Sequence, residues 1–327
     1  MKTAVLFGGE SMERDVSVAS AAQVVPALRS KGHEVSAVDA GRGVLDAAEE
    51  AAVFARTIDR EPPELTSSSA LLRVAAELAD QAFDIVFLAM HGGAGEDGTL
   101  QSLLDLHGIR YTGSGRLGSA LAWDKRVSKQ LFALAQIPTP AWRVAPASAE
   151  AVERDLGFPV IVKPSGQGST VGLTRVDEAD GLEAAIGHAT RFDPDVLIET
   201  YIPGRELTVG VLGDEPLAVG EIIPAEGDIF DYQAKYQPDG AEELFPADIP
   251  EALAQQAQTL ALIAHHALRL SHYSRADFRL DETGSLWCLE VNTLPGLSRG
   301  SLMPQSAAAA GIEFAELCDR ICRAALE

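Results

Sequence analysis

The chain has 327 residues, with 48 acidic against 26 basic side chains and a formal net charge of −22. A surface this acidic repels nucleic acid and anionic membranes, so we expect neither as a partner. The length is enough for about two or three domains with a substantial core. The first apolar run, residues 3–7, is too short for a signal peptide, and no stretch reaches transmembrane length, which predicts a soluble, cytoplasmic protein.

The three cysteines are Cys288, Cys318 and Cys322. Cys318 and Cys322 have the spacing of one helix face, but no third or fourth metal ligand lies near them in the sequence. An odd number of thiols in a long chain predicts buried, reduced cysteines rather than a zinc site or a disulfide framework.

The first third of the chain has the pattern of an open parallel sheet, with predicted strands at 3–7, 33–39 and 83–90. The first strand leads through two glycines into a helix, but the third glycine of the dinucleotide fingerprint is missing. Ligands bind at the carboxyl ends of such strands, where Glu13 and His91 fall. Glu13 can complement the helix dipole or hold a substrate ammonium group, and His91 can be structural or act chemically.

The middle of the chain predicts a helix at 124–134 and a buried strand at 157–164 that carries Lys163 near its end. The residues that follow, 165–172, are rich in glycine and hydroxyl side chains. Such a loop can bind a triphosphate through backbone N–H groups beside the charge of Lys163, although it can also be a plain hairpin turn. It is not a Walker P-loop, whose lysine follows the glycines on a helix.

Two later segments have the character of ligand-binding connections. Residues 196–206 predict an apolar strand, a bend and an acidic residue that begins the next strand. This pattern suits a linker that reads an adenine edge and ribose hydroxyls, and it equally suits an ordinary crossover between strands. Residues 230–240 are polar and aromatic without a clear period, which is typical of a mobile active-site lid.

A β-hairpin is predicted where the turn signal at 281–284 separates two short alternating runs. Side chains alternate between the two faces of a strand. Arg275, Asp277, Glu290 and Asn292 should therefore project from one face of this hairpin.

This polar face is the strongest candidate for a metal site. With a two-residue hairpin loop, Asp277 would face Cys288, and Glu290 would sit one diagonal step away. Two carboxylates and an amide are hard oxygen ligands that suit Mg²⁺, whereas the alternative is an exposed hairpin whose polar face meets water. The chain then continues to Ser301 through a loop rich in free backbone donors, which can bind anions.

These motifs occur together, and the set resembles the D-alanine:D-alanine ligases of the ATP-grasp superfamily over nearly the whole chain. A set spread over the chain is far more specific than any one of its members. The segments that carry the resemblance are GGES at 8–11, HGGAGEDG at 91–98, WDK at 123–125, VKP at 162–164, AKY at 234–236 and EVNTLPG at 290–296.

The resemblance implies an α/β protein with a three-domain ATP-grasp architecture. An N-terminal open parallel-sheet domain on the substrate side is expected at 1–115. A central α+β domain with the glycine-rich loop is expected at 116–199, and a C-terminal α+β domain with the lid and the metal site at 200–327. The second and third domains would clasp ATP.

The implied reaction is the ATP-dependent ligation of two D-alanines through an acyl phosphate, for the synthesis of peptidoglycan precursors. D-alanine and ATP are then the expected small-molecule partners, with Mg²⁺ or Mn²⁺, as two ions, as the metal cofactor. The family also implies a homodimer.

The resemblance assigns roles to individual residues. The implied catalytic set is Glu13, His91, Ser169, Tyr236, Arg275 and Gly296. The implied substrate-binding set is Glu13, Val16, Ser17, His91, Arg275, Gly296, Ser301 and Leu302. The implied ATP-binding set is Lys125, Lys163, Ser165, Gly168, Ser169, Glu199, Tyr201, Ile202, Glu206, Lys235 and Asn292. The implied metal ligands are Asp277, Glu290 and Asn292.

The sequence departs from the family pattern at a few positions, namely Trp123, Gln167, Thr170 and 298–300. None of them removes a charge that the chemistry needs, but residues 298–300 lie beside the expected second substrate. Another ATP-grasp carboxylate:amine ligase, with D-serine, D-lactate or another amino acid as acceptor, therefore stays open. A nucleotide-binding regulator without turnover is a further alternative.

Overall fold

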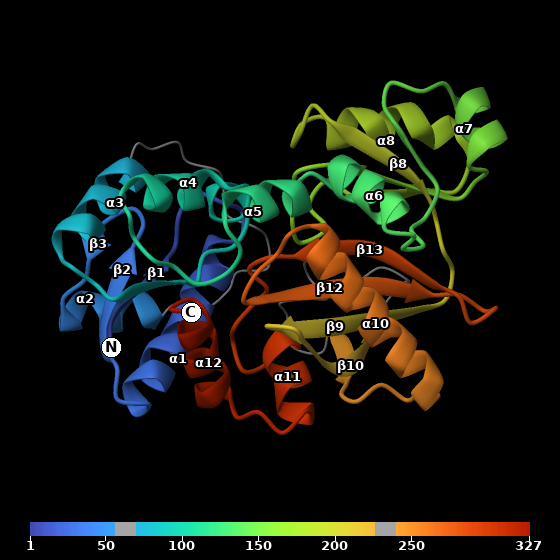
Figure 1. The fold of residues 1–327 in the computed structure, drawn as a ribbon. Helices are drawn as coiled ribbons and strands as arrows, with labels where there is room; N and C mark the ends of the chain where they lie inside the picture. The colour runs from blue at the N-terminus through green and yellow to red at the C-terminus, as the bar shows by residue number, and fades with distance from the viewer. Residues whose placement is uncertain (56–69, 226–239) are drawn as a thin grey trace.

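The computed structural model describes residues 1–55, 70–225 and 240–327, and its strands form three separate β-sheets. The sheets lie in different parts of the molecule and helices pack around them (Figure 1). Within the described ranges, no helix is both long and apolar enough to cross a bilayer. The predicted α/β class is confirmed, and the domain boundaries at 115 and 199 stay a prediction.

The first sheet has the strand order β3-β2-β1-β4. Its strands are β1 (Lys2–Phe7), β2 (Glu34–Asp39), β3 (Gly43–Val44) and β4 (Ile85–Leu88). As predicted, β1 is parallel to β2 and β4, and the apolar runs of β1 and β4 are buried on both faces. The short β3 adds an antiparallel edge that the sequence did not indicate. The helical segments of this part are α1 (Arg14–Ser30), α2 (Ala47–Phe54), α3 (Ala70–Asp80), the 3₁₀ turn η1 (Gly93–Gly95), α4 (Thr99–Leu106) and α5 (Arg116–Trp123).

The second sheet is antiparallel, with the strand order β5-β8-β6-β7. Its strands are β5 (Trp142–Val144), β6 (Val160–Pro164), β7 (Thr174–Val176) and β8 (Val196–Thr200). The helical segments are α6 (Lys125–Leu134), α7 (Ala149–Asp155), the 3₁₀ turn η2 (Ala179–Gly181) and α8 (Leu182–Ala189). The side chain of Asp124 caps α6 by accepting the N–H groups of Arg126 and Val127. This cap places the lysine of the WDK motif in the first turn of the helix.

The third sheet is also antiparallel, with the strand order β11-β10-β9-β12-β13. Its strands are β9 (Arg205–Leu212), β10 (Glu215–Pro224), β11 (Ala241–Leu244), β12 (Tyr273–Leu280) and β13 (Leu286–Asn292). Helices α10 (Glu251–Ala267) and α11 (Leu302–Ala309) both pack on β9 and β10.

The predicted hairpin is formed by β12 and β13, but its loop is longer than two residues and spans 281–285. A bulge also shifts the register, so that Asp277 lies opposite Glu290. The expectation that Asp277 faces Cys288 is wrong, because it assumed a two-residue loop and no bulge. The polar residues of the predicted face remain on one side, and the two carboxylates are direct neighbours across the strands.

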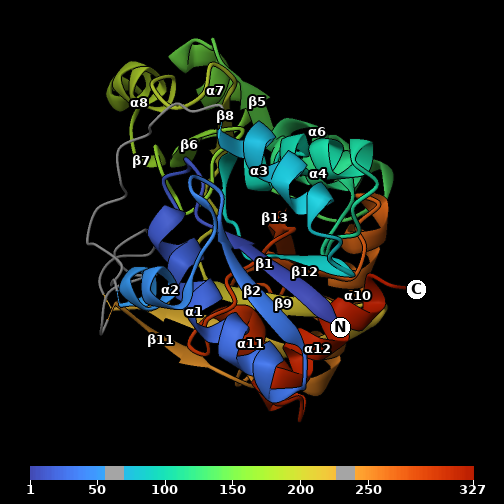
Figure 2. The same ribbon diagram turned by 90° about the vertical axis from the view of Figure 1, so that its left-hand side faces the viewer.

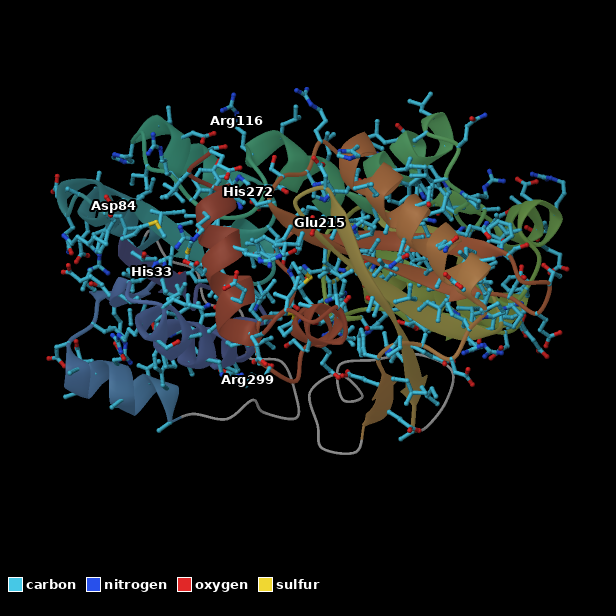
Figure 3. All side chains as sticks on the ribbon, turned by 60° about the horizontal axis from the view of Figure 1, so that its bottom comes forward. His33, Asp84, Arg116, Glu215, His272 and Arg299 are labelled. Atoms are coloured by element: carbon cyan, nitrogen blue, oxygen red, sulfur yellow. The ribbon has the colours of Figure 1, made fainter. Side chains whose placement is uncertain are left out.

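The last helix, α12 (Phe314–Ala324), returns to the first sheet and packs beside α1 (Figures 1 and 2). Its apolar face joins the same buried cluster as β1 and β4. Arg299, marked in Figure 3, lies over the ring of Phe314 at the start of this helix. Cys318 and Cys322 are buried in the cluster, and with Cys288 they are free thiols, as predicted.

Candidate active site

The candidate active site is a cavity of about 230 Å³ whose lining comes from all three parts of the molecule. Glu13 follows β1 and His91 follows β4, at the carboxyl ends of the parallel strands. Ser169 comes from the glycine-rich loop after β6, and Arg275 and Glu290 come from the β12–β13 hairpin. Segments far apart in the sequence therefore meet at one site, as the resemblance implies.

Two smaller cavities continue this site. The first shares Arg275 and Glu290 with the large cavity and contains Lys125 and Lys163. The second shares Lys163 with the first and is lined by Tyr201, Ile202 and Glu206, among others. These three adjoining cavities are called the trough below, and the middle one is lined by charged side chains.

Asp277 is held by hydrogen-bond donors on several sides. Arg275 donates to its two carboxylate oxygens at 2.9 and 2.8 Å. Asn292 Nδ2 donates at 2.9 Å and Thr208 Oγ1 at 2.7 Å. This buried charge is paired and oriented by its neighbours, which fixes the direction of the carboxylate on the hairpin face.

The residues predicted to hold a metal form a set of hard oxygen donors. Asp277 and Glu290 are opposite each other across the strands, and Glu290 Oε2 lies 3.2 Å from Lys125 Nζ. In the part of the chain that the structure describes, no cluster of three or more His, Cys, Asp or Glu side chains could hold a metal ion. Two carboxylates and the amide of Asn292 fit Mg²⁺ that keeps several positions for phosphate oxygens.

A buried ion-pair triad lies behind the lysine-lined cavity. Glu199 Oε1 is 2.9 Å from Lys129 Nζ, and Glu199 Oε2 is 2.9 Å from Lys163 Nζ. Lys129 Nζ also donates to Thr139 Oγ1 at 2.6 Å. Burial lowers the pKa of Lys129, while for Lys163 the attraction of Glu199 and Glu290 outweighs burial and raises the pKa. Glu199 holds Lys163 in position and also lines the cavity that contains Tyr201, and its predicted place around the nucleotide stays a prediction.

The glycine-rich loop contacts the first sheet through Glu13. Ser169 Oγ donates a short hydrogen bond to Glu13 Oε1. A Cβ on Gly92 or Gly168 would overlap Glu13 Oε2, so glycine at both positions is needed for this approach. Ser169 and Thr170 have φ values of 48° and 64°, in the left-handed region that costs a non-glycine residue about 1 kcal/mol.

His91 links the first sheet to the loop after β13. One ring nitrogen, Nδ1, lies 2.8 Å from Leu294 O, and the other, Nε2, lies 2.9 Å from Ser20 Oγ. Ser20 Oγ in turn accepts the N–H of Leu297 at 3.2 Å. Burial lowers the pKa of His91, so the ring is neutral and Nδ1–H donates to the carbonyl. This geometry positions the loop, and the predicted contact of His91 with substrate stays a prediction.

The far end of the trough has an aromatic wall. Arg175 lies over the ring of Tyr201 at 4.3 Å, and Arg279 lies at 5.8 Å. Arg279 Nε donates to Ile202 O at 3.1 Å, and its Nη1 is 3.4 Å from Glu206 Oε2. A flat side chain beside backbone groups and a carboxylate suits an aromatic base and a sugar, the part of a nucleotide that the sequence predicted here.

Not every predicted site residue reaches a cavity. The large cavity is lined by several of them, including Val16, Gly296, Ser301 and Leu302. Ser17 is buried behind it, where its Oγ accepts the N–H of Gly8 at 2.7 Å and donates to Ala89 O at 2.6 Å. Ser165 is also buried, and its Oγ donates to Asp124 Oδ1 at 3.0 Å. Both serines hold backbone segments of the site in place.

Two predicted residues, Lys235 and Tyr236, lie outside the described residues. Their predicted lid role is therefore untested. Conversely, the sequence reasoning missed Lys129, which lies one helical turn after Lys125 on α6. That spacing of four was the available signal, because it puts both lysines on one helix face.

This chain is similar to known proteins over its whole length. The family models described as "D-ala D-ala ligase N-terminus" and "D-ala D-ala ligase C-terminus" match residues 2–114 and 132–323. Curated proteins named D-alanine–D-alanine ligase from Gluconobacter oxydans and Gloeobacter violaceus are each 41% identical. These alignments cover 100% of this chain and 99% and 100% of those proteins.

Solved structures give the same answer at the level of the fold. A Bacillus anthracis D-alanine–D-alanine ligase complexed with ATP superposes with a TM-score of 0.80 at 29% identity. It covers 100% of this chain and 97% of its own. A second structure of that enzyme has a TM-score of 0.81 at 31% identity, with the same coverage. The predicted ATP-grasp architecture is confirmed, and the chain belongs to the D-alanine–D-alanine ligase family.

Proposed function

We propose that this protein joins two D-alanine molecules into D-alanyl-D-alanine while ATP is converted to ADP and phosphate. The observation that carries the proposal is that the three cavities adjoin and share lining residues. The pocket beside Tyr201 leads through the lysine-lined cavity to the large cavity with Glu13 and Arg275. A nucleotide in the narrow part and an amino acid in the wide part would meet at the hairpin face.

ATP would bind along the narrow part of the trough. The base would lie beside Tyr201 and Ile202, and Glu206 would accept ribose hydroxyl groups. Lys125 and Lys163 would contact the phosphates, together with backbone N–H groups of the loop that contains Gly168. A Bacillus anthracis relative was solved in complex with ATP, which supports ATP as the nucleotide.

Asp277, Glu290 and Asn292 are the residues that would hold Mg²⁺ or Mn²⁺, with two ions expected from the family. When bound, the metal neutralises charge on the transferred phosphate. The protein's own part is to fix the ligands, and the contacts of Arg275 and Asn292 with Asp277 do so.

In the first step, a carboxylate oxygen of the first D-alanine attacks the γ-phosphorus of ATP. The bond from phosphorus to the ADP oxygen breaks, so an acyl phosphate and ADP form. Glu13 holds the ammonium group of this substrate, while Lys125 and Lys163 stabilise the charge that spreads over the phosphate oxygens. Most of the acceleration comes from positioning and charge neutralisation.

In the second step, the amine of the second D-alanine, after losing a proton, attacks the acyl carbon. The carbon–oxygen bond to phosphate then breaks, and the dipeptide and phosphate are released. Arg275 and the backbone at Gly296 would donate to the oxyanion of the tetrahedral intermediate. Ser301 and Leu302 would bind the carboxylate of this second substrate, and Lys235 with Tyr236 would close the site.

The product suits the synthesis of peptidoglycan precursors, the role that the family implies. We also propose that the protein works as a homodimer in the cytoplasm, with Mg²⁺ as its usual metal.

An assay of ADP release, coupled to NADH oxidation, tests the proposal with D-alanine, L-alanine, D-serine and D-lactate in turn. We expect turnover with D-alanine alone and formation of the dipeptide, checked by mass spectrometry. Faster turnover when D-serine or D-lactate is added as acceptor would replace the proposed second substrate. Absence of D-alanine-dependent ADP release would refute the proposal.

A further inference from the structure

One buried carboxyl group in the large cavity has no part in the chemistry above. Glu96 follows the glycine-rich turn after β4 and is 9% exposed. Its Oε1 accepts the N–H of Gly92 at 2.9 Å. Among the described residues its Oε2 forms no hydrogen bond, and Glu96 lines the large cavity and an adjoining small one.

Glu13 lines the same two cavities. One of its oxygens, Oε1, already accepts the hydrogen bond from Ser169. A substrate ammonium group carries three N–H donors, so it can take a second carboxylate partner besides Glu13. Glu96 brings a second carboxyl group to the part of the site that Glu13 lines, since both residues line the large cavity and the adjoining small one.

Charged and titratable groups face Glu96 from several elements. Glu13 lies at the start of α1, Lys125 on α6, and Arg275 and Tyr273 on β12. Burial and the nearby charge of Glu13 raise the pKa of Glu96 to about 8, against the opposing effects of the Gly92 N–H, Arg275 and Lys125. At neutral pH, Glu96 is therefore mostly the neutral acid when no substrate is bound.

We propose that Glu96 is a second carboxylate ligand of the ammonium group of the first D-alanine, and that binding of this substrate releases a proton. The inference rests on the proposed function, since it takes Glu13 as the first ligand. An ammonium group between the two side chains stabilises ionised Glu96, so the carboxyl proton passes to solvent. The O–H bond of the Glu96 carboxyl group breaks, its electron pair stays on the carboxylate oxygen, and water takes up the proton.

The linkage has a definite sign. The substrate binds the ionised form of Glu96 better, so its affinity rises with pH until the empty site is itself ionised, above about pH 8. Below that value each pH unit changes the affinity by up to about tenfold. Proton release is largest on the acidic side of pH 8 and falls toward zero at pH 9.

Isothermal titration calorimetry of the whole protein tests the proposal. D-Alanine is titrated in the presence of Mg²⁺ and a non-hydrolysable ATP analogue, at pH 7, in buffers of different ionisation enthalpy. Wild type should release up to about 0.9 of a proton per donor bound, the fraction of Glu96 that is protonated there. Glu96→Gln should release almost none and should bind about tenfold more weakly at pH 8.5. Glu34→Gln, which removes an exposed carboxylate on β2, should behave as wild type.

Several outcomes are decisive. Wild type that binds D-alanine without releasing a proton, or Glu96→Gln that releases as many as wild type, overturns the inference. If Glu96→Gln does not fold, wild type titrated at pH 6, 7 and 9 decides, because release must vanish at pH 9. Binding and ADP formation without proton release would leave the proposed function intact, whereas absence of both would remove the function and the inference together.

Discussion

The buried carboxylate of Glu199 forms ion pairs with two lysines and so holds Lys163 in the candidate site. Its side chain is 3% exposed and lies between Lys129 and Lys163, whose side chains are 0% and 9% exposed. Replacing Glu199 with Gln leaves two buried positive charges facing each other. We expect unfolding free energy to fall by about 3 kcal/mol, measured by urea denaturation.

Lys129→Met tests the same ion-pair triad by removing one of its positive charges instead of the negative one. It leaves the neutral Glu199–Lys163 pair, so its cost should be smaller than that of Glu199→Gln. Arg320→Met, which breaks an exposed pair with Glu316 on α12, should leave the transition unchanged. Equal stability of Glu199→Gln and wild type would show that the triad does not hold the site together.

The β12–β13 hairpin carries two aspartates with different tasks. Asp277 faces the cavity within the proposed metal set, while Asp281 sits in the turn and accepts hydrogen bonds from Thr283, Ser285 and Trp287. Asp277→Asn should lower kcat for ADP release by at least about a hundredfold. The substitution removes a carboxylate ligand of the metal that would neutralise the charge of the transferred phosphate. Asp281→Asn should lower the melting temperature but keep kcat.

Metal removal probes the same element without a substitution. EDTA should abolish ADP release, and added Mg²⁺ should restore it in wild type but not in Asp277→Asn. Full activity of the metal-free protein would contradict the proposed ligand set.

At the scale of the whole molecule, α12 packs the C-terminal part of the chain against the first sheet and its helix α1. His33 Nε2 lies 2.8 Å from Asp319 Oδ1, and His33 Nδ1 lies 3.1 Å from Thr3 Oγ1. Although burial opposes it, hydrogen bonds from Arg323 and His33 hold the pKa of Asp319 below its usual value. Because the pKa of Asp319 is lower in the folded protein than in the unfolded chain, its ionised carboxylate stabilises the fold at pH values above the pKa of unfolded Asp. This stabilisation is lost as the pH falls through the pKa of Asp319 in the folded protein.

Asp319→Asn should therefore melt below wild type at pH 7, and the difference should shrink as the pH falls below 4. Asp180→Asn, an exposed carboxylate at η2, serves as the control and should follow wild type at every pH. Differential scanning calorimetry from pH 7 to pH 3 measures both. A difference between Asp319→Asn and wild type that stays constant over this range would show that Asp319 does not act through its charge.

Much of the site could be predicted from the sequence, because the direction of a side chain along a strand follows from local periodicity. Alternation along two strands is enough to put Asp277, Glu290 and Asn292 on one face. The apolar strand that ends at His91 is enough to put that residue at a ligand-binding edge. Motifs spaced over the chain then identified the ATP-grasp fold and the ligase family, which the comparisons confirmed.

Contacts between distant segments were decided only by the tertiary structure. The register that pairs Asp277 with Glu290 depends on a bulge, which the hydrophobic pattern does not encode. The ion pair of Lys129 with Glu199 and the raised pKa of Glu96 depend on burial, and burial follows from how the sheets pack rather than from neighbours in the chain. Periodicity determines which way a side chain points, but a charge acquires its chemistry from the groups that folding brings around it.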